Sequence, residues 1–100
     1  MRADSVDDHV TITVDGHLDA DAGNKLVDAV MSALLGFPSR IDIDLSVLTS
    51  FTSNGAMALA RSRELCAHLS DGLHYRTEGG AGQLALLSAF EREPEVDTLT

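Results

Sequence analysis

Apolar and polar side chains alternate in two short segments of the chain, residues 9–14 and 40–45. The apolar positions are Val10, Ile12 and Val14 in the first segment and Ile41, Ile43 and Leu45 in the second. A period of two is typical of a strand with one buried face. In the second segment Asp42 and Asp44 fall on the opposite face from the apolar residues. Both segments are therefore predicted to be strands of a sheet that is covered chiefly on one side.

Two helices are predicted from apolar residues at three- and four-residue spacing and from their end signals. The first begins at Asp19 or Asp21, since either carboxylate can cap a helix N-terminus, and it ends before Gly36. Its apolar stripe consists of Leu26, Val27, Val30, Met31, Leu34 and Leu35. The second begins at Ser53 or Asn54 and runs to about Leu69. Alanines at its start would let it approach the sheet closely.

The remaining segments complete a mixed α/β pattern. Residues 73–77 are predicted to be a strand, and the glycine-rich run 79–82 turns into a third helix that ends before Pro94. Residues 96–99 would form a last short strand, and residues 1–8 a tail or an edge strand. The fold class expected is α/β, with one domain over residues 1–100. It would hold a mixed sheet of four to five strands, with helices chiefly on one face.

Composition limits the classes of function. The chain has 100 residues, 44% of them hydrophobic, four aromatic residues and a net charge of −9. A surface this acidic disfavours direct binding to nucleic acid and favours a partner with a basic face. No apolar run approaches the ~20 residues of a membrane span, so we expect a cytoplasmic protein without membrane insertion. The single cysteine, Cys66, excludes a disulfide within the chain, and we interpret it as a packing residue.

The stretch 47–55 carries the chain's candidate chemistry, because an apolar strand ends there and a polar turn leads into the second helix. Ser53 or Asn54 would cap that helix, whose partly positive N-terminus also suits an anion or a partner's carboxylate. The four histidines show no metal-ligand spacing, and residues 19–24 do not match a calcium loop. No nucleophile is found with a base near it. We therefore expect neither an enzyme nor a bound cofactor or metal.

Two short motifs at matching separation carry a resemblance to a known family. The first is Gly16, Leu18 and Asp19 before the first helix; the second is Asp44-Leu45-Ser46 followed by Ser53 and Gly55 at the start of the second helix. Together with the order of strands and helices, they resemble the STAS domain of bacterial anti-sigma factor antagonists. The resemblance covers roughly residues 9–99. It implies a single STAS-like domain.

The resemblance also implies a function and a switch. Such domains bind a cytoplasmic anti-sigma factor, often a serine kinase, and so release the sigma factor that it holds. Phosphorylation of a Ser or Thr at the start of the second helix breaks that binding. A phosphate adds about −1.5 to −2 charges at the docking surface, which repels the partner.

This chain departs from the motif at the switch. Thr52 replaces the family's Asp, and Asn54 stands at the phosphoacceptor position. Asn54 has no hydroxyl, so the usual phosphorylation is expected to be absent and the surface to stay competent for binding. Ser53 is the alternative acceptor, and Thr52 a further one. The partner contacts implied by the resemblance are Thr52, Ser53, Asn54, Gly55, Met57 and Arg61, although Met57 has the alternative of packing in the core.

A second interpretation also agrees with the absence of a phosphoacceptor at position 54. Related STAS-like subunits dock on the ATPase of a lipid-transporting ABC system and need no phosphorylation there. The neighbouring genes would discriminate between the two readings, since kinase or sigma-factor genes favour the first and permease or ATPase genes the second.

Overall fold

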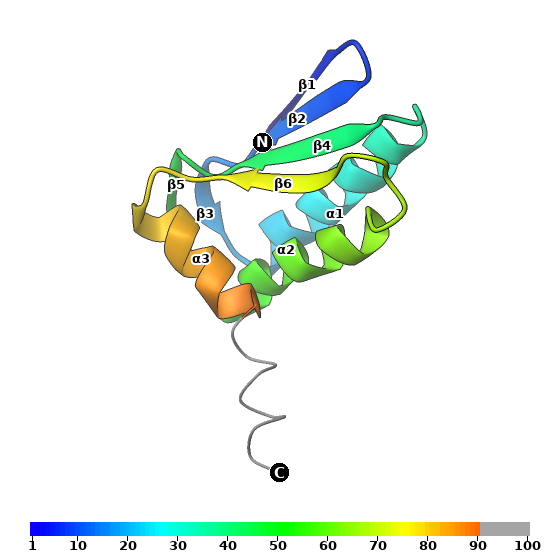
Figure 1. Cartoon of the computed structure of the whole chain (residues 1–100). Coiled ribbons are helices and arrows are strands. Elements are labelled where there is room, and N and C mark those ends of the chain that lie inside the picture. Colours follow the sequence, from blue (N-terminus) through cyan, green and yellow to red (C-terminus); the bar gives the residue numbers. More distant parts are fainter. Residues whose placement is uncertain (91–100) are drawn as a thin grey trace.

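The computed structural model describes residues 1–90, which form a layer of strands and a layer of helices (Figure 1). The elements are β1 (Arg2–Val6), β2 (His9–Thr13), β3 (Gly16–Leu18), α1 (Ala20–Leu34), β4 (Arg40–Asp44), β5 (Leu48–Phe51), α2 (Ser53–Leu65), β6 (Gly72–Arg76) and α3 (Gly80–Phe90). The predicted helix end near Pro94 and the predicted strand at 96–99 lie outside the described residues.

Four strands form the main sheet, in the order β1-β2-β4-β6. β2, β4 and β6 are parallel, and β1 is antiparallel to β2. The register places Ile12 beside Ile43 and Ile43 beside Tyr75, so the alternating apolar residues share one face. The three helices cover that face (Figure 1). The predicted α/β fold, a mixed sheet with helices on one face, is confirmed, and residues 2–6 take the form of an edge strand rather than a tail.

A second sheet of two strands, β3 and β5, was not predicted. It pairs Gly16 with Leu48, His17 with Ser50 and Leu18 with Phe51, and its register shifts between the first two pairs. Gly16 has a φ of +71°, a conformation that glycine adopts without strain. β3 is three residues long, which is too short for a periodic pattern. The sequence pattern therefore predicted no strand between β2 and α1.

The core of the described residues is aliphatic. The main sheet contributes Ile12, Ile41 and Ile43, and α1 contributes Leu26 and Val30; all five side chains have no exposed surface. Cys66 is also fully buried. Burial raises the pKa of its thiol, because the thiolate would be poorly solvated. A buried thiol with a raised pKa is unreactive, which agrees with a packing role.

The helix ends differ from the prediction for α2 and agree with it for α1. Asp19 caps α1, and its carboxylate accepts a hydrogen bond from the Ala22 backbone nitrogen at 2.9 Å. For α2 the cap is Thr52, not Ser53 or Asn54, because the Thr52 hydroxyl is the group that reaches the Gly55 nitrogen, at 3.1 Å. α2 ends at Leu65, earlier than predicted. Turn hydrogen bonds follow it, from the Ala67 nitrogen to the Glu64 carbonyl and from the Leu69 nitrogen to the Cys66 carbonyl.

The N-terminal turns of α1 and α2 pack against each other through small residues. A Cβ atom on Gly55 would collide with the Leu18 carbonyl and lie 2.9 Å from the Asp19 carbonyl oxygen. A Cβ on Gly23 would lie 3.1 Å from the Ala58 Cβ and 3.3 Å from the Gly55 carbonyl oxygen. Only glycine at position 55 therefore allows α2 to begin directly beneath the end of β3.

Gly55→Ala is expected to destabilise the protein by about 3 kcal/mol, because the added methyl group meets rigid backbone rather than a flexible side chain. Gly36→Ala is the control, since its Cβ would make an ordinary contact of 3.6 Å with the Ala33 carbonyl oxygen. We expect the control to change the free energy of unfolding by less than about 0.5 kcal/mol. Urea unfolding followed by circular dichroism measures both. Equal stability of the two variants would contradict the close approach of α2.

Candidate functional site

The polar stretch between β5 and α2 lies at the surface. Thr52, Ser53, Asn54, Met57 and Arg61 are all exposed, and we refer to these five residues as the α2 surface. The Thr52 nitrogen donates a 2.9 Å hydrogen bond to the Leu18 carbonyl, which fixes the point where the chain leaves β5 and enters α2. Gly55, which the resemblance had placed among the contact residues, is buried beneath this surface. Its place in the fold is to position the turn.

The hydroxyl and amide groups of the α2 surface differ in what they do. The Thr52 hydroxyl is engaged as the helix cap. Within residues 1–90, the Ser53 and Asn54 side chains make no hydrogen bond to another group of the protein. They extend from the first turn of α2, where the free backbone N–H groups create a partly positive potential. This turn holds no acidic residue, so that potential is not offset from within the helix.

A shallow groove between α1 and α2 runs along the α2 surface. One cavity of about 230 Å³ is lined by Asn54, Met57 and Arg61 from α2 and by Ala20, Gly23 and Asn24 from α1. A second, of about 260 Å³, is lined by Val27 and Met31 from α1 and by Arg61, Glu64 and Leu65 from α2. Arg61 borders both. Met57 is 43% exposed, so the alternative that it packs in the core is wrong.

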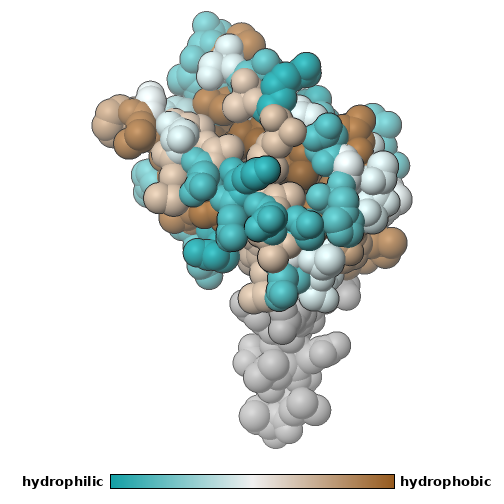
Figure 2. Space-filling model, turned by 180° about the vertical axis from the view of Figure 1, so that it is seen from behind, coloured by the Kyte–Doolittle hydropathy of each residue, from teal (hydrophilic) through white to brown (hydrophobic). Residues whose placement is uncertain are grey.

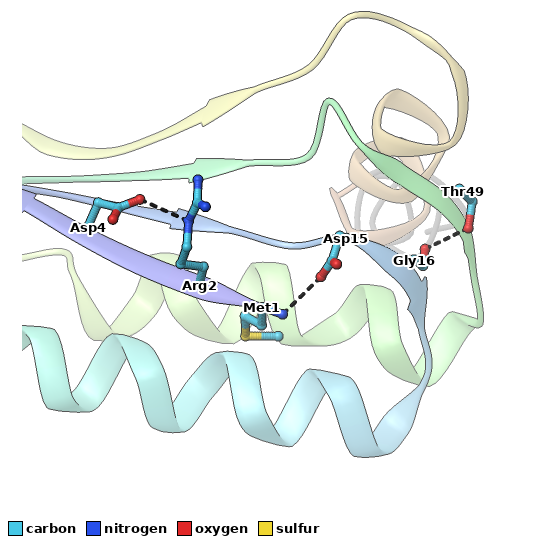
Figure 3. Close-up of polar contacts among 6 residues, drawn as sticks. All are labelled: Met1, Arg2, Asp4, Asp15, Gly16 and Thr49. Atoms are coloured by element: carbon cyan, nitrogen blue, oxygen red, sulfur yellow. Dashed lines mark hydrogen bonds and ion pairs between the residues drawn. The ribbon is translucent and has the colours of Figure 1, made fainter.

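The small sheet adds polar groups that the sequence interpretation did not place near α2. His17 Nδ1 and Ser50 Oγ lie 2.6 Å apart on paired positions of β3 and β5. Thr49 Oγ1 donates a 2.9 Å hydrogen bond to the Gly16 carbonyl, drawn in Figure 3 together with the contact of the Met1 amino group and Asp15. These bonds cross-link the two short strands that lead into α1 and α2. In the sequence, the signal for these hydrogen bonds would have been the polar residues at matching positions in two segments, one after β2 and one after β4.

The remaining motif residues serve the fold. Asp44 Oδ1 accepts hydrogen bonds from the backbone nitrogen and the hydroxyl of Ser46, at 2.9 and 2.7 Å. These bonds lower the pKa of the Asp44 carboxyl and hold the turn after β4. The glycine-rich run leads into α3 as a turn, with positive φ at Gly79 and Gly80 and with Gly82 buried against the Leu45 carbonyl.

Two further properties concern residues 1–90. No helix there is long and apolar enough to cross a membrane. No three His, Cys, Asp or Glu side chains of this part are grouped so that they would hold a metal ion.

Thr52→Ala is expected to lower the free energy of unfolding by about 1 kcal/mol, because it removes the cap and leaves the Gly55 nitrogen without its acceptor. Ser53→Ala, one residue away, should change it by less than about 0.5 kcal/mol, since this hydroxyl caps nothing. Thr52→Ser should keep most of the stability. Chemical denaturation of the three variants measures the differences. A larger loss of stability for Ser53→Ala than for Thr52→Ala would show that Ser53 is the cap.

Asp19 is expected to make stability depend on acid pH. The hydrogen bond from the Ala22 nitrogen lowers the pKa of its carboxyl below the ordinary 3.8, so the folded state favours the charged form. This stabilisation is complete above the unfolded-state pKa of about 3.9 and is lost as the pH falls through the lower folded-state pKa. Asp19→Asn, which still caps α1, should therefore lose less stability than the wild type between about pH 5 and pH 2. Asp28→Asn, in the middle of α1, is the control. Identical pH profiles for Asp19→Asn and the wild type would exclude this contribution.

Comparison with known proteins supports the fold. The chain is similar to an anti-sigma factor antagonist from Mycobacterium paratuberculosis, with a TM-score of 0.68 and 21% identity over 98% of this chain and 76% of that one. It is also similar to the protein named Mglu, with a TM-score of 0.62 and 15% identity; the match covers 78% of this chain but only 19% of Mglu. No family model matches the chain, and no curated protein sequence matches it significantly. The chain has the fold of an anti-sigma factor antagonist.

Proposed function

We propose that the protein is a regulatory binding module of the anti-sigma antagonist type, which binds an anti-sigma factor or a serine kinase through the α2 surface. The observation that carries this proposal is the exposed first turn of α2, with Asn54 at the position of the family's phosphoacceptor, on a fold shared with an anti-sigma factor antagonist. The function resides in binding, and we assign no catalytic residue.

The α2 surface offers three kinds of contact to such a partner. The amide of Asn54 and the hydroxyl of Ser53 can donate and accept hydrogen bonds. Met57 provides exposed apolar surface in the cavity that Asn54 and Arg61 also line, and Met adapts its shape to a partner. Arg61 contributes a guanidinium group that suits a carboxylate on the partner. Together they combine exposed apolar surface with hydrogen-bonding and charged groups, as docking surfaces do.

In this proposal the surface is not switched by phosphorylation at position 54. Asn54 is neutral and has no hydroxyl, so the surface remains in the binding-competent state. Ser53 is the alternative acceptor. A phosphate there would leave the helix from a different direction, because neighbouring residues of a helix point about 100° apart. It would still bring negative charge to the surface that binds the partner.

The second candidate is a STAS-like accessory subunit that docks on the ATPase of a lipid-transporting ABC system. The observation that favours it is the same absence of a hydroxyl at position 54, since such a subunit needs no switch. It predicts a transporter ATPase as the bound partner and places no requirement on a neutral side chain at Asn54, which would then be a residue of the helix start.

The partner is first captured from the protein's own cells and identified by mass spectrometry. Asn54→Asp is then expected to weaken the complex with the anti-sigma factor or kinase by about tenfold or more. Such a factor corresponds to about 1.4 kcal/mol of binding free energy. The reason is a negative charge at the docking surface. Asn54→Ser should bind like the wild type and become phosphorylated by a kinase partner, whereas the wild type is not.

The control is Ser70→Asp, which adds the same charge in the exposed turn beyond the other end of α2. It should change the affinity by less than about twofold, measured by calorimetry. Equal weakening by Asn54→Asp and Ser70→Asp would contradict docking at the start of α2. A phosphopeptide from the native protein that spans residues 52–54 would contradict the absence of the switch. Capture of a transporter ATPase would establish the second candidate instead.

A further inference from the structure

The edge strand β1 extends beyond the layer of helices. Its register places Ala3 beside Ile12 and Ser5 beside Val10, so these side chains share the face that the helices cover. Ile12 and Val10 are 0% and 8% exposed, yet Ala3 and Ser5 are exposed like the rest of β1. At the top of Figure 1 the hairpin of β1 and β2 projects away from the helices. The inner face of β1 therefore lacks a covering element.

A groove lies where this covering element is missing. Its volume is about 510 Å³, and it runs between the inner face of β1 and the C-terminal half of α1. One wall is formed by Ala3 and Ser5, and the other by Ala29, Ser32 and Ala33. All of these side chains are small, so the groove has room for large side chains from a partner. We refer to this cavity as the β1–α1 groove.

The groove is closed at one end by the turn between β1 and β2 and by the loop after α1. Val10, Gly36 and Pro38 line it there. The Ser39 nitrogen donates a 2.9 Å hydrogen bond to the Asp8 carbonyl, which joins the turn to the loop. The cavity thus has two walls of small side chains and an end where the turn and the loop are joined by a backbone hydrogen bond.

Large apolar side chains lie beside this closed end without cover. Leu35 is 80% exposed, and Phe37 is 90% exposed. Phe37 also has a φ of +54°, a left-handed conformation that an aromatic residue rarely adopts, and its nitrogen bonds to the Leu34 carbonyl. Figure 2, which views the molecule from behind, shows brown apolar surface at the hairpin end and at the side where α1 ends, among teal hydrophilic residues. Leu35 and Phe37 flank Gly36, which lines the groove, and large exposed apolar side chains next to an apolar groove are typical of an interaction surface.

Charge identifies the kind of partner. Asp7 and Asp8 line the groove, and none of the described residues that line it is Lys or Arg. Within residues 1–90 the ion-pair contact to these two carboxylates comes from His9, whose Nε2 lies 3.7 Å from Asp8 Oδ1. An apolar groove with carboxylates at its end favours an apolar segment that carries Lys or Arg.

Two other occupants fit less well. A second copy of this chain would bring another net charge of −9 to an acidic groove. The other occupant considered is the chain beyond Phe90, which also has more acidic than basic residues. It starts at the end of α3, at Phe90. Phe90 packs against Tyr75, on β6, and β6 is at the opposite edge of the sheet from β1.

We propose that the β1–α1 groove is a second docking surface, for a protein segment that inserts bulky apolar side chains and places Lys or Arg opposite Asp7 and Asp8. This proposal does not depend on the α2 surface. The two surfaces are separate, because the groove is lined by Ala29, Ser32 and Ala33 of α1, and none of these residues lines the two cavities at the α2 surface. One module would then bind two partners, or two parts of one partner, at the same time.

The test uses an amphipathic peptide of Leu and Lys, about four helical turns long, as the probe, with the same peptide carrying Glu in place of Lys as its control. Amide shifts of the isotope-labelled full chain report where each peptide binds. We expect the Lys peptide to shift residues 3–10 and 29–38 and the Glu peptide to shift neither. Asp7→Asn with Asp8→Asn should weaken the Lys peptide at least tenfold, since Asn also tolerates a positive φ such as the +57° of Asp7.

The control for total charge is Asp21→Asn with Glu78→Gln, which removes two exposed carboxylates that do not line the groove. It should change the affinity less than twofold. Ser32→Trp, which fills the groove from α1, should abolish the shifts while the rest of the spectrum stays that of the folded protein. Equal weakening by the two double variants, or shifts confined to other residues, would overturn the proposal. Shifts of residues 3–10 and 29–38 that depend on protein concentration without peptide would instead show a self-interface and overturn it too.

Discussion

The close approach of α1 and α2 at their N-termini is the contact on which the candidate site depends. Gly55 lies against the Leu18 carbonyl, and Gly23 faces Ala58 across the two helices. Because no side chain separates the backbones there, the first turn of α2 is held at a fixed height beside the end of β3. Thr52, Ser53 and Asn54 are thereby exposed on a rigid turn rather than on a mobile loop. Because the turn is held in place, its residues lose less conformational freedom when a partner binds.

Parts of this arrangement were predictable from the sequence because their patterns are long. The alternation around Ile12 and Ile43 identified β2 and β4, and the stripe that includes Leu26 and Val30 identified α1. Asp19 was one of two predicted caps, with Asp21, because both precede that stripe and either carboxylate can cap a helix. β3 and β5 were missed, since three or four residues carry no period. The cap at Thr52 depends on which of three adjacent polar side chains reaches the Gly55 nitrogen, and that is decided by the tertiary position of the turn.

The surfaces were less predictable than the fold, because exposure depends on what lies opposite a residue. Met57 has the same local pattern as a core residue, yet it faces the groove between α1 and α2. Ala3 and Ser5 lie beside the buried Ile12 and Val10, yet both are exposed. The two surfaces differ in character: Arg61 lies on one and Asp7 and Asp8 on the other. Under the two proposals, the α2 surface suits a partner with a carboxylate and the β1–α1 groove suits a partner with Lys or Arg.

Docking at the α2 surface can be tested directly by a hydrogen-exchange footprint of the chain in complex with the anti-sigma factor or kinase captured from its own cells. We expect binding to slow amide exchange in the first turns of α2, from Thr52 to Arg61, and along the facing turns of α1. Unchanged exchange over this stretch, with protection confined to other parts of the molecule, would contradict docking at the α2 surface.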